Sequence, residues 1–413
     1  MAPARSKARH SKARPTPVTS ESLSGTNLTR AGDYNQRVTL QAIRANGSAT
    51  RAELTTITGL TPPAIGNITA RLHSDGLIKP DGRVQGGRGQ PALKFVVDPE
   101  GAFSLGLNID RDHISLVAMD FTGAIRDRSL LEAKFALPGE VLHFVQAQLK
   151  RIKRQSRVNT DRLIGIGIGI PDNLGNILLP HRPEAYHRWA EIDVCQYFSE
   201  ALGLPAYSEN DATAAAVGEL QFGSGRGRQH FILTLISAGL GSGLIVNGQP
   251  YRGADNCSGE IAFIAQSLFA GGASQGILQD KVSLYALYDY LSERGFQVSD
   301  PAQLADPAPD CRAAIDAWIE MTADLLLGPF AVMNCAFNPE RHYIASRMPA
   351  PVIERLCDRL NTRLRQALPL APNIAPFAAA TAAEDAAPMG AAVLVFQNRL
   401  LPRPEALKKT LAS

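Results

Sequence analysis

The stretch that decides the architecture of the N-terminal part is AELTTITGLTPPAIGNITARLHSDGL, residues 52–77. It predicts two short helices joined by a tight turn. Thr50 and Glu53 have the spacing of a capping box, and Thr61 followed by Pro62 predicts an N-cap and a first-turn proline for the second helix. Two short helices in this order are typical of a helix-turn-helix.

The second of these helices has one apolar face and one small or polar face. Ile65, Ile68 and Leu72 recur at three-four spacing and predict the buried face. The outer face then carries Pro63, Ala64, Gly66, Asn67 and Arg71. Such a face suits the major groove of DNA, where Asn67 and Arg71 are the predicted groove-facing residues. Gly66 costs roughly 1 kcal/mol of helix stability relative to alanine, so it indicates either close approach to DNA or mere tolerance.

A basic hairpin follows the helix pair. A strand begins near residue 78, Asp81-Gly82 is predicted to turn it, and residues 86–91 lead into a second strand over 93–97. Arg83 and Arg88 lie at the predicted tip, where they are expected to contact phosphates or the minor groove. With a first helix over residues 35–45, residues 34–98 form a predicted winged helix-turn-helix. The alternative is a small helical subdomain that packs on its neighbour.

Charge is unevenly distributed along the 413 residues. Residues 1–98 contain 14 Lys or Arg and 6 Asp or Glu, a net charge of +8 that leaves −5 for the remainder. A basic head on a mildly acidic body indicates a polyanion partner at the head. Residues 1–33 have little to bury and are predicted to be a disordered basic tail, either solubilising or adding phosphate contacts.

The remaining composition excludes several classes of protein. The five cysteines are dispersed and predict reduced thiols in a cytoplasmic protein with no metal knuckle. The basic N-terminus has no apolar segment after it, so it does not predict a secretory signal. No apolar run is long enough to cross a bilayer, so no membrane partner is expected.

From residue 101 the pattern becomes α/β. Strands are predicted over residues 103–109, 114–120, 128–135 and 163–170, with a helix over 139–155, and long helices recur over 280–291 and 311–330. The predicted domains are a first lobe over residues 101–225, completed by a C-terminal helix within 385–400, and a second lobe over 226–384.

At this point the motifs resemble those of ROK-family transcriptional regulators. The head carries TGL at its turn and GGRGQPA in its wing, and the body carries ENDATAA at residues 209–215. Further matches are GIP at 169–171 with Gly175, SAGLGSG at 237–243, and GEI at 259–261. The resemblance implies an N-terminal winged helix-turn-helix followed by a two-lobed actin-like ATPase (ROK) fold.

The resemblance also implies a sugar pocket. Asn210, Asp211 and Glu260 would bond sugar hydroxyls, and Gln279 aligns with a further contact residue of the family. Phe263 stands where the family has a contact histidine. Alternatively, Asn210 and Asp211 are only caps of the following helix, and Glu260 is only a surface carboxylate.

The resemblance also implies that the kinase motifs of the family are degenerate here. Asp211 aligns with the catalytic base and is interpreted as vestigial, so no catalytic residue is assigned. The family's phosphate loop DxGGTK aligns with NIDRDH at residues 108–113, where Asp110 and Asp112 would repel phosphate. No ATP cofactor is therefore expected. ASR at residues 345–347 replaces a glycine-rich turn, and the zinc motif is replaced by Phe263, Ala270, Gly272 and Ile277, so no metal is expected.

These features predict a DNA-binding transcriptional regulator, most simply a repressor, and not an enzyme. The expected partners are operator DNA and a sugar or sugar phosphate effector, in a homodimer or homotetramer. Two alternatives stay open: a ligand-independent DNA-binding regulator, and an ATP-dependent sugar kinase that carries a DNA-binding head.

Overall fold

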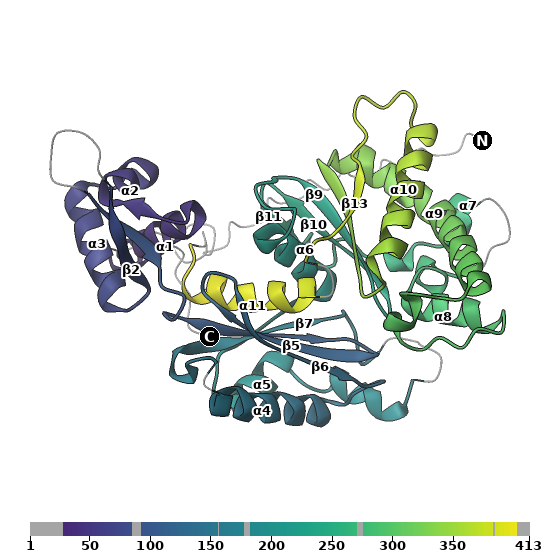
Figure 1. The fold of residues 1–413 in the computed structure, drawn as a ribbon, viewed down its shortest axis with the longest axis horizontal. Helices are drawn as coiled ribbons and strands as arrows, with labels where there is room; N and C mark the ends of the chain where they lie inside the picture. The colour runs from purple at the N-terminus through teal and green to yellow at the C-terminus, as the bar shows by residue number, and fades with distance from the viewer. Residues whose placement is uncertain are drawn as a thin grey trace, which may run out of the picture.

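A small head and a two-lobed body make up the described part of the chain (Figure 1). The computed structural model describes residues 28–84, 92–155, 157–176, 182–270, 276–382 and 385–402. The predicted α/β architecture, a winged head followed by two lobes, is confirmed. Arg88 of the predicted wing tip and residues 1–27 of the predicted tail lie outside the described residues.

The head combines three helices with an antiparallel sheet of strand order β1-β3-β2. Its elements are α1 (Leu28–Asn46), β1 (Ala49–Thr50), α2 (Arg51–Thr58), α3 (Pro62–Ser74), β2 (Ile78–Val84) and β3 (Ala92–Val97). The prediction of disorder was wrong for residues 28–33, which are helical. The segment LTRAGDY contains one glycine but no proline, so nothing stops α1 from extending upstream of residue 35.

Local signals in the head were predicted with mixed success. The capping box of α2 is confirmed, because Thr50 Oγ1 accepts a bond from the Glu53 N–H and the Glu53 carboxylate accepts one from the Thr50 N–H. Thr61 precedes α3 as predicted, but its side chain makes no capping bond. Asp81-Gly82 does not end the strand. Gly82 adopts a φ of 75° in a bulge, and β2 continues past it to pair with β3.

The first lobe is a five-stranded sheet of order β6-β5-β4-β7-β8. Helices α4 and α5 lie below it and α11 lies above it (Figure 1). Its elements are β4 (Phe103–Ile109), β5 (His113–Asp120), β6 (Ile125–Glu132), α4 (Pro138–Gln155), β7 (Leu163–Ile170), α5 (Val194–Leu202), β8 (Ala206–Asn210) and α6 (Asp211–Phe222). Strand β6 starts three positions earlier than residue 128, because Asp120 accepts bonds from the Thr122 and Ala124 N–H groups and closes a tight turn.

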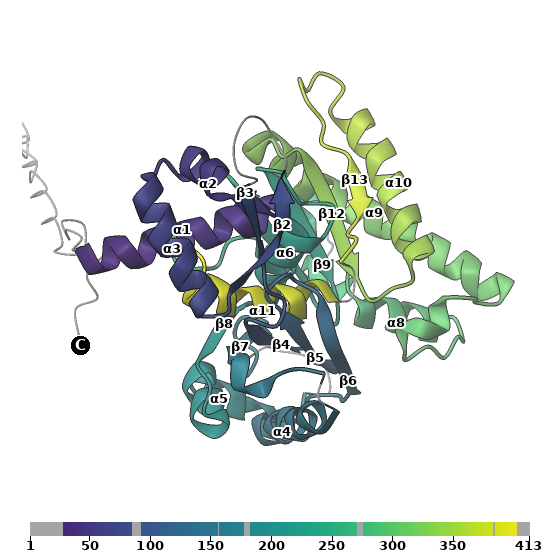
Figure 2. The same ribbon diagram turned by 60° about the vertical axis from the view of Figure 1, so that its left-hand side comes forward.

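The second lobe is a five-stranded sheet of order β11-β10-β9-β12-β13. Its elements are β9 (Phe231–Ile236), β10 (Leu240–Val246), β11 (Gln249–Tyr251), α7 (Ser267–Ala270), α8 (Leu284–Ser292), α9 (Pro309–Phe337), β12 (Arg341–Ser346), α10 (Ala350–Ala367) and β13 (Phe377–Ala379). Helices α8, α9 and α10 cover this lobe away from the head (Figure 2). Helix α9 runs past residue 330 because Pro329 is accommodated within it.

Helix α11 (Ala386–Arg399) returns from the second lobe and packs between the sheet of the first lobe and α6. Glycines allow this close approach. A methyl group at Gly390 would overlap the carbonyl oxygen of Ala214 in α6, and one at Gly106 in β4 would overlap the carbonyl oxygen of Pro388. At these glycines the backbone of α11 therefore lies directly against the backbones of α6 and β4.

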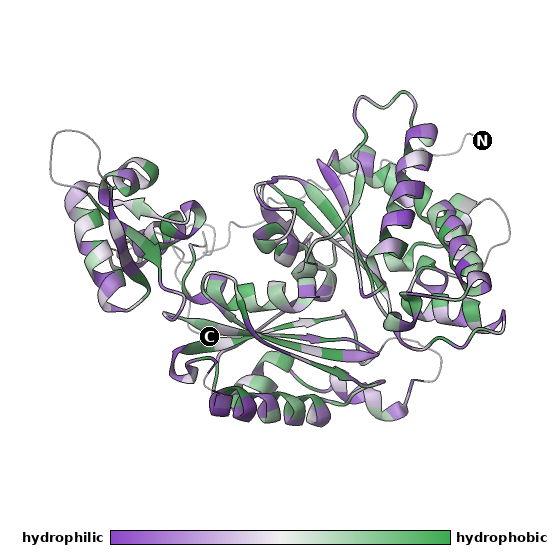
Figure 3. Cartoon of the chain, viewed as in Figure 1, coloured by the Kyte–Doolittle hydropathy of each residue, from purple (hydrophilic) through white to green (hydrophobic). Residues whose placement is uncertain are grey.

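Hydropathy follows these layers. The strands of the first lobe are largely hydrophobic, whereas hydrophilic residues gather on the outward side of α4 (Figure 3). Within the described residues, no helix is both long and apolar enough to cross a bilayer.

Replacing Gly390 by alanine tests the close contact of α11. The added methyl group meets the backbone of Ala214, so the helices must separate, and we expect Gly390→Ala to lower the free energy of unfolding by about 3 kcal/mol or more. Urea denaturation measures this change. Gly139→Ala in α4 is the matched control, because nothing lies within 4 Å of its added methyl group. The free energy of unfolding of that variant should rise by up to about 1 kcal/mol. Equal effects of the two substitutions would contradict a close backbone contact at Gly390.

Candidate functional site

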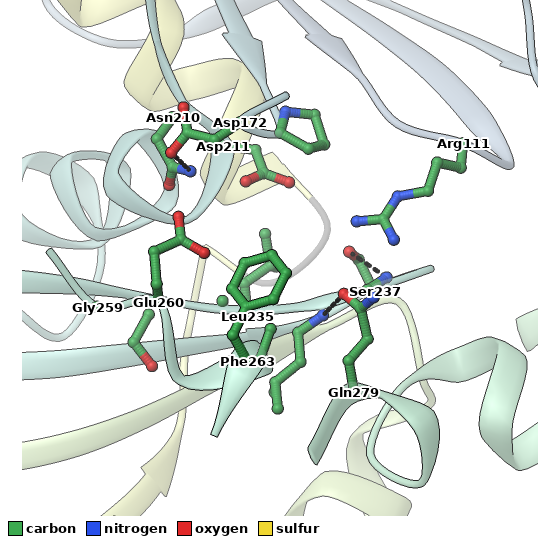
Figure 4. Close-up of a pocket in the computed structure, with 16 residues that line it drawn as sticks. Arg111, Asp172, Asn210, Asp211, Leu235, Ser237, Gly259, Glu260, Phe263 and Gln279 are labelled. Atoms are coloured by element: carbon green, nitrogen blue, oxygen red, sulfur yellow. Dashed lines mark hydrogen bonds between the residues drawn. The ribbon is translucent and has the colours of Figure 1, made fainter. Parts of the chain in front are cut away.

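A polar pocket lies between the two lobes, where the carboxyl ends of the parallel strands β4, β7 and β8 face the β9–β10 hairpin (Figure 4). Its lining is polar on both sides of the cleft and includes Arg111, Asp172, Asn210, Asp211, Ser237, Glu260, Phe263 and Gln279. The free space is about 30 Å³, which holds one or two water molecules.

The start of α6 supplies two of the predicted pocket residues. Asn210 caps the helix, because its Oδ1 accepts a bond from the Thr213 N–H at 3.1 Å. Its Nδ2 donates to Asp172 at 3.0 Å. Asp211 is 7% exposed, accepts a bond from the Ala212 N–H at 2.8 Å, and points into the pocket (Figure 4). The capping role is thus real for Asn210, and it holds the two side chains at the pocket wall.

Two pocket carboxyls have strongly raised pKa values. Burial, together with the negative charge of Asp110, raises the pKa of Asp211 to about 7. Burial and a hydrogen bond with Asp172 raise the pKa of Glu260 to about 7. Glu260 is half-buried beside the pocket, so it is not a free surface carboxylate. Near neutral pH these carboxyls can donate as well as accept hydrogen bonds, which suits the recognition of hydroxyl groups.

Gln279 and Phe263 form part of the second lobe's side of the pocket. The Gln279 side chain is buried and its Oε1 accepts a bond from the Leu240 N–H at 3.3 Å. Phe263 is 58% exposed at the rim. Without the zinc motif, packing alone was expected to hold the loop from Gln266 to Gln279, and this expectation was wrong, because hydrogen bonds also hold it. Gln266 donates to the Ile277 carbonyl at 2.8 Å, and the Ile277 N–H donates to Asp280 at 2.9 Å.

Two pocket residues escaped the sequence analysis. Asp172 follows the carboxyl end of β7, and the rule that ligands bind outside the carboxyl ends of parallel strands could have found it. Arg111 lies within the NIDRDH segment at residues 108–113, and its entry into the pocket was not predicted. Its side chain is 5% exposed and extends into the pocket (Figure 4).

The loop between β4 and β5 forms a charged cluster. Its two aspartates do not stand as unpaired negative charges, because Arg111 Nε lies 3.7 Å from Asp110 and Arg347 Nη1 lies 3.6 Å from Asp112. Burial would raise the pKa of Asp112, but the hydrogen bond from His113 and the charges of His113 and Arg347 outweigh burial and lower it. Asp110, Asp112 and His113 lie close enough to share one metal ion, but these cations already compensate both carboxylates.

The head presents the predicted DNA-binding face. In α3, Pro63, Asn67 and Arg71 are exposed and Ala64 and Gly66 are partly exposed, whereas Ile65, Thr69 and Leu72 are buried. Arg83 is exposed on β2. An added methyl group at Gly66 meets nothing within 4 Å, so the packing of the head does not require glycine there.

The head is anchored on the body through α1. The Arg44 guanidinium donates to the carbonyl of Phe121 at 3.3 Å and to Gln221 Oε1 at 3.1 Å, and it lies 5.8 Å from the ring centroid of Phe222. Burial lowers the pKa of Arg44 to about 10. Arg37 donates to the carbonyl of Asn398 at the end of α11. One hydrophobic core is continuous from the head helices into β5, α6 and α11.

Comparison with known proteins agrees with this architecture. Residues 104–398 match the ROK family, and residues 33–79 match the family described as winged helix-turn-helix DNA-binding. The chain is 29% identical over 236 residues to the xylose repressor of Bacillus spizizenii, a match covering 55% of this chain and 59% of that repressor. It is 26% identical over 321 residues to the DNA-binding transcriptional repressor Mlc of Escherichia coli, covering 73% of this chain and 77% of Mlc.

A solved structure extends the comparison to the fold. The crystal structure of a ROK family transcriptional regulator, a homologue of the E. coli Mlc protein, has a TM-score of 0.66 to this chain at 20% identity. The match covers 89% of this chain and 96% of that chain. The chain therefore belongs to the ROK family, and it joins a ROK body to an N-terminal winged helix-turn-helix DNA-binding domain.

Proposed function

We propose that this ROK protein is a transcriptional repressor that binds operator DNA through its head and a sugar or sugar derivative through the interlobe pocket. The observation that carries the proposal is the position of α6. Asn210 and Asp211 at its first turn line the pocket, and Gln221 and Phe222 at its last turn contact Arg44 of the head. A single helix thus joins the ligand site to the DNA-binding domain.

The chemistry of the pocket supports a polyhydroxylated ligand. Asp211 and Glu260, each with a pKa of about 7, together with the Asn210 amide, offer donors and acceptors at short range. The repressor named for xylose and the repressor Mlc among the relatives support the same assignment. Binding would change the closure of the two lobes, and a rigid head would move with the first lobe. In a two-fold homodimer, or in a homotetramer, this motion would change the spacing of two heads on a palindromic operator.

Regulation, not phosphoryl transfer, is the proposed output. The loop that holds nucleotide phosphates in ROK kinases is here occupied by the side chains of Asp110 and Arg111, and Asp112 is paired with Arg347 across the lobes. A kinase needs backbone N–H groups that are open to phosphate at this position. Asp211 therefore serves as a ligand contact in this proposal, and no catalytic role is assigned to it.

The small free space in the pocket favours a second candidate, a ligand-independent repressor whose pocket has become packing. A thermal-shift screen of the full chain against free and phosphorylated sugars separates the two. A ligand present at a hundred times its Kd stabilises a protein by about 2.7 kcal/mol, which a melt detects. A sugar that raises the Tm and alters operator binding supports the sensor, whereas operator binding that no sugar affects supports the second candidate.

Asp211→Asn tests the pocket carboxyl through both stability and ligand response. The raised pKa of Asp211 means that the folded protein holds a proton that the unfolded chain releases, so wild-type stability falls as pH rises from about 4 to 7. Asparagine removes this dependence. We expect the free energy of unfolding of the variant, relative to that of wild type, to rise by on the order of 2 kcal/mol from pH 5 to pH 8. The variant should also lose its sugar-induced Tm shift. Asp193→Asn at the cap of α5 is the control, and a pH-independent difference at Asp211 would contradict the assignment.

Gly66→Ala tests whether the α3 backbone approaches DNA closely. Because the methyl group meets no protein atom, the variant should be up to about 1 kcal/mol more stable than wild type. We expect its operator affinity to fall at least tenfold in fluorescence anisotropy, since the methyl group would stand between backbone and groove. Gly139→Ala in α4 should leave DNA affinity unchanged. Undiminished affinity of Gly66→Ala would mean that this glycine is merely tolerated.

Arg44→Met tests the contact between α6 and the head. Methionine keeps much of the packing against Phe121 and Phe222 but loses the bonds to Gln221 and the Phe121 carbonyl. We expect effector affinity to stay within about twofold of wild type, while the effect of ligand on operator affinity falls by a factor of about five or more. Gln221→Ala removes one of the same bonds from the other side, and unchanged coupling in both variants would exclude this route.

A further inference from the structure

The Arg111 side chain is a buried cation without a full set of hydrogen bonds. It is 5% exposed, and its closest ionic partner is the neighbouring Asp110, whose Oδ1 lies 3.7 Å from Nε. That distance exceeds a hydrogen bond. Nε and Nη1 are buried and make no hydrogen bond to any described residue. Guanidinium N–H groups left in this state are costly, so they favour an acceptor that arrives from outside the chain.

The guanidinium is aimed across the pocket. It extends from the β4–β5 loop of the first lobe towards Ser237 and Gln279 of the second lobe (Figure 4). Gly239 makes room for it, because a methyl group at that position would overlap the guanidinium. An acceptor held by Arg111 would therefore lie at the junction of the two lobes, beside the hydroxyl of Ser237.

The opposite end of the pocket has a different character. Asp172, Asn210 and Glu260 gather there, away from Arg111, with Asp211 between the two ends (Figure 4). The Asp172 carboxylate is engaged by the Asn210 amide, and the pKa of Glu260 is about 7. One end of the pocket thus offers both hydrogen-bond donors and acceptors for hydroxyl groups, and the other end offers the planar guanidinium of Arg111.

We propose that the effector of this pocket is an anionic sugar derivative, whose phosphate or carboxylate binds the Arg111 guanidinium while its hydroxyl groups bind at the Asp172–Glu260 end. This inference rests on the proposed sensor function and specifies its ligand class. A phosphate or carboxylate accepts two parallel N–H bonds from a guanidinium, a geometry that a neutral hydroxyl cannot match. The same anion would bridge the lobes, because Arg111 belongs to one lobe and Ser237 to the other.

The test is a set of isothermal titrations of the full chain with matched ligands. Glucose, mannose, N-acetylglucosamine and xylose are each compared with their terminal phosphates and their aldonic acids, which separates the two sources of negative charge. We expect one anionic member to bind at least about 100-fold more tightly than its neutral parent. Arg111→Gln should remove most of that preference and leave the neutral parent within a few-fold. Arg111→Lys should keep part of it, because a point charge remains.

Arg182→Gln is the matched control, since Arg182 also comes from the first lobe but bonds the Gly175 carbonyl at 2.9 Å instead of lining the pocket. It should keep the preference for the anion. A neutral sugar that binds as tightly as its phosphate, or more tightly to Arg111→Gln than to wild type, would overturn this inference and leave the sensor intact. In the second case the Arg111 side chain would fill the pocket and compete with the ligand. If no member binds to wild type or variant, the sensor function itself fails, and this inference fails with it.

Discussion

The body depends on one close contact, the passage of α11 between α6 and the sheet of the first lobe. Helices with ordinary side chains pack at interaxial distances of 8–10 Å, whereas here glycines on both partners bring backbone against backbone. Gly218 in α6 faces the Ala386 carbonyl, and Gly390 in α11 faces the Ala214 carbonyl. Such a contact leaves no soft side chains to absorb a change in crossing angle. The two helices therefore behave as one unit that joins both lobes.

The end of α6 is tied to the second lobe by a buried carboxylate. Glu219 accepts bonds from the N–H groups of Ser224, Thr381 and Ala382, the last two in the segment that leads from β13 to α11. Glu219 thus contacts both of the chain segments that run between the two lobes, the one after α6 and the one before α11. A ligand that changed the closure of the lobes would act on these two segments. Helix α6, which lies between them, also reaches Arg44 in the head. This path supports a regulator in which ligand and DNA affect each other's affinity.

Charged side chains fill the loop between β4 and β5, which aligns with the phosphate loop of the family's kinases. Phosphate loops present backbone N–H groups to the phosphate, whereas the side chains of Asp110, Arg111 and Asp112 occupy this loop. The new charges are paired with each other and with Arg347 of the second lobe. Arg111 differs from the others because its Nε and Nη1 are buried and make no hydrogen bond within the described residues, although the guanidinium lies beside Asp110. The loop that aligns with the phosphate loop of the kinases thus lines a polar pocket between the two lobes.

The sequence by itself determined the local elements and the family. The capping box at Thr50 and Glu53, the buried strand at Leu163–Ile170 and the exposed face of α3 follow from signals within one element. Asn210 and Asp211 were found because a contiguous motif carries them. Asp172 and the orientation of Arg111 were not, because they join the pocket only when β4, β7 and β8 align their carboxyl ends beside the second lobe. The anchoring of Arg44 against α6 likewise joins residues 177 positions apart, and only tertiary packing brings them together.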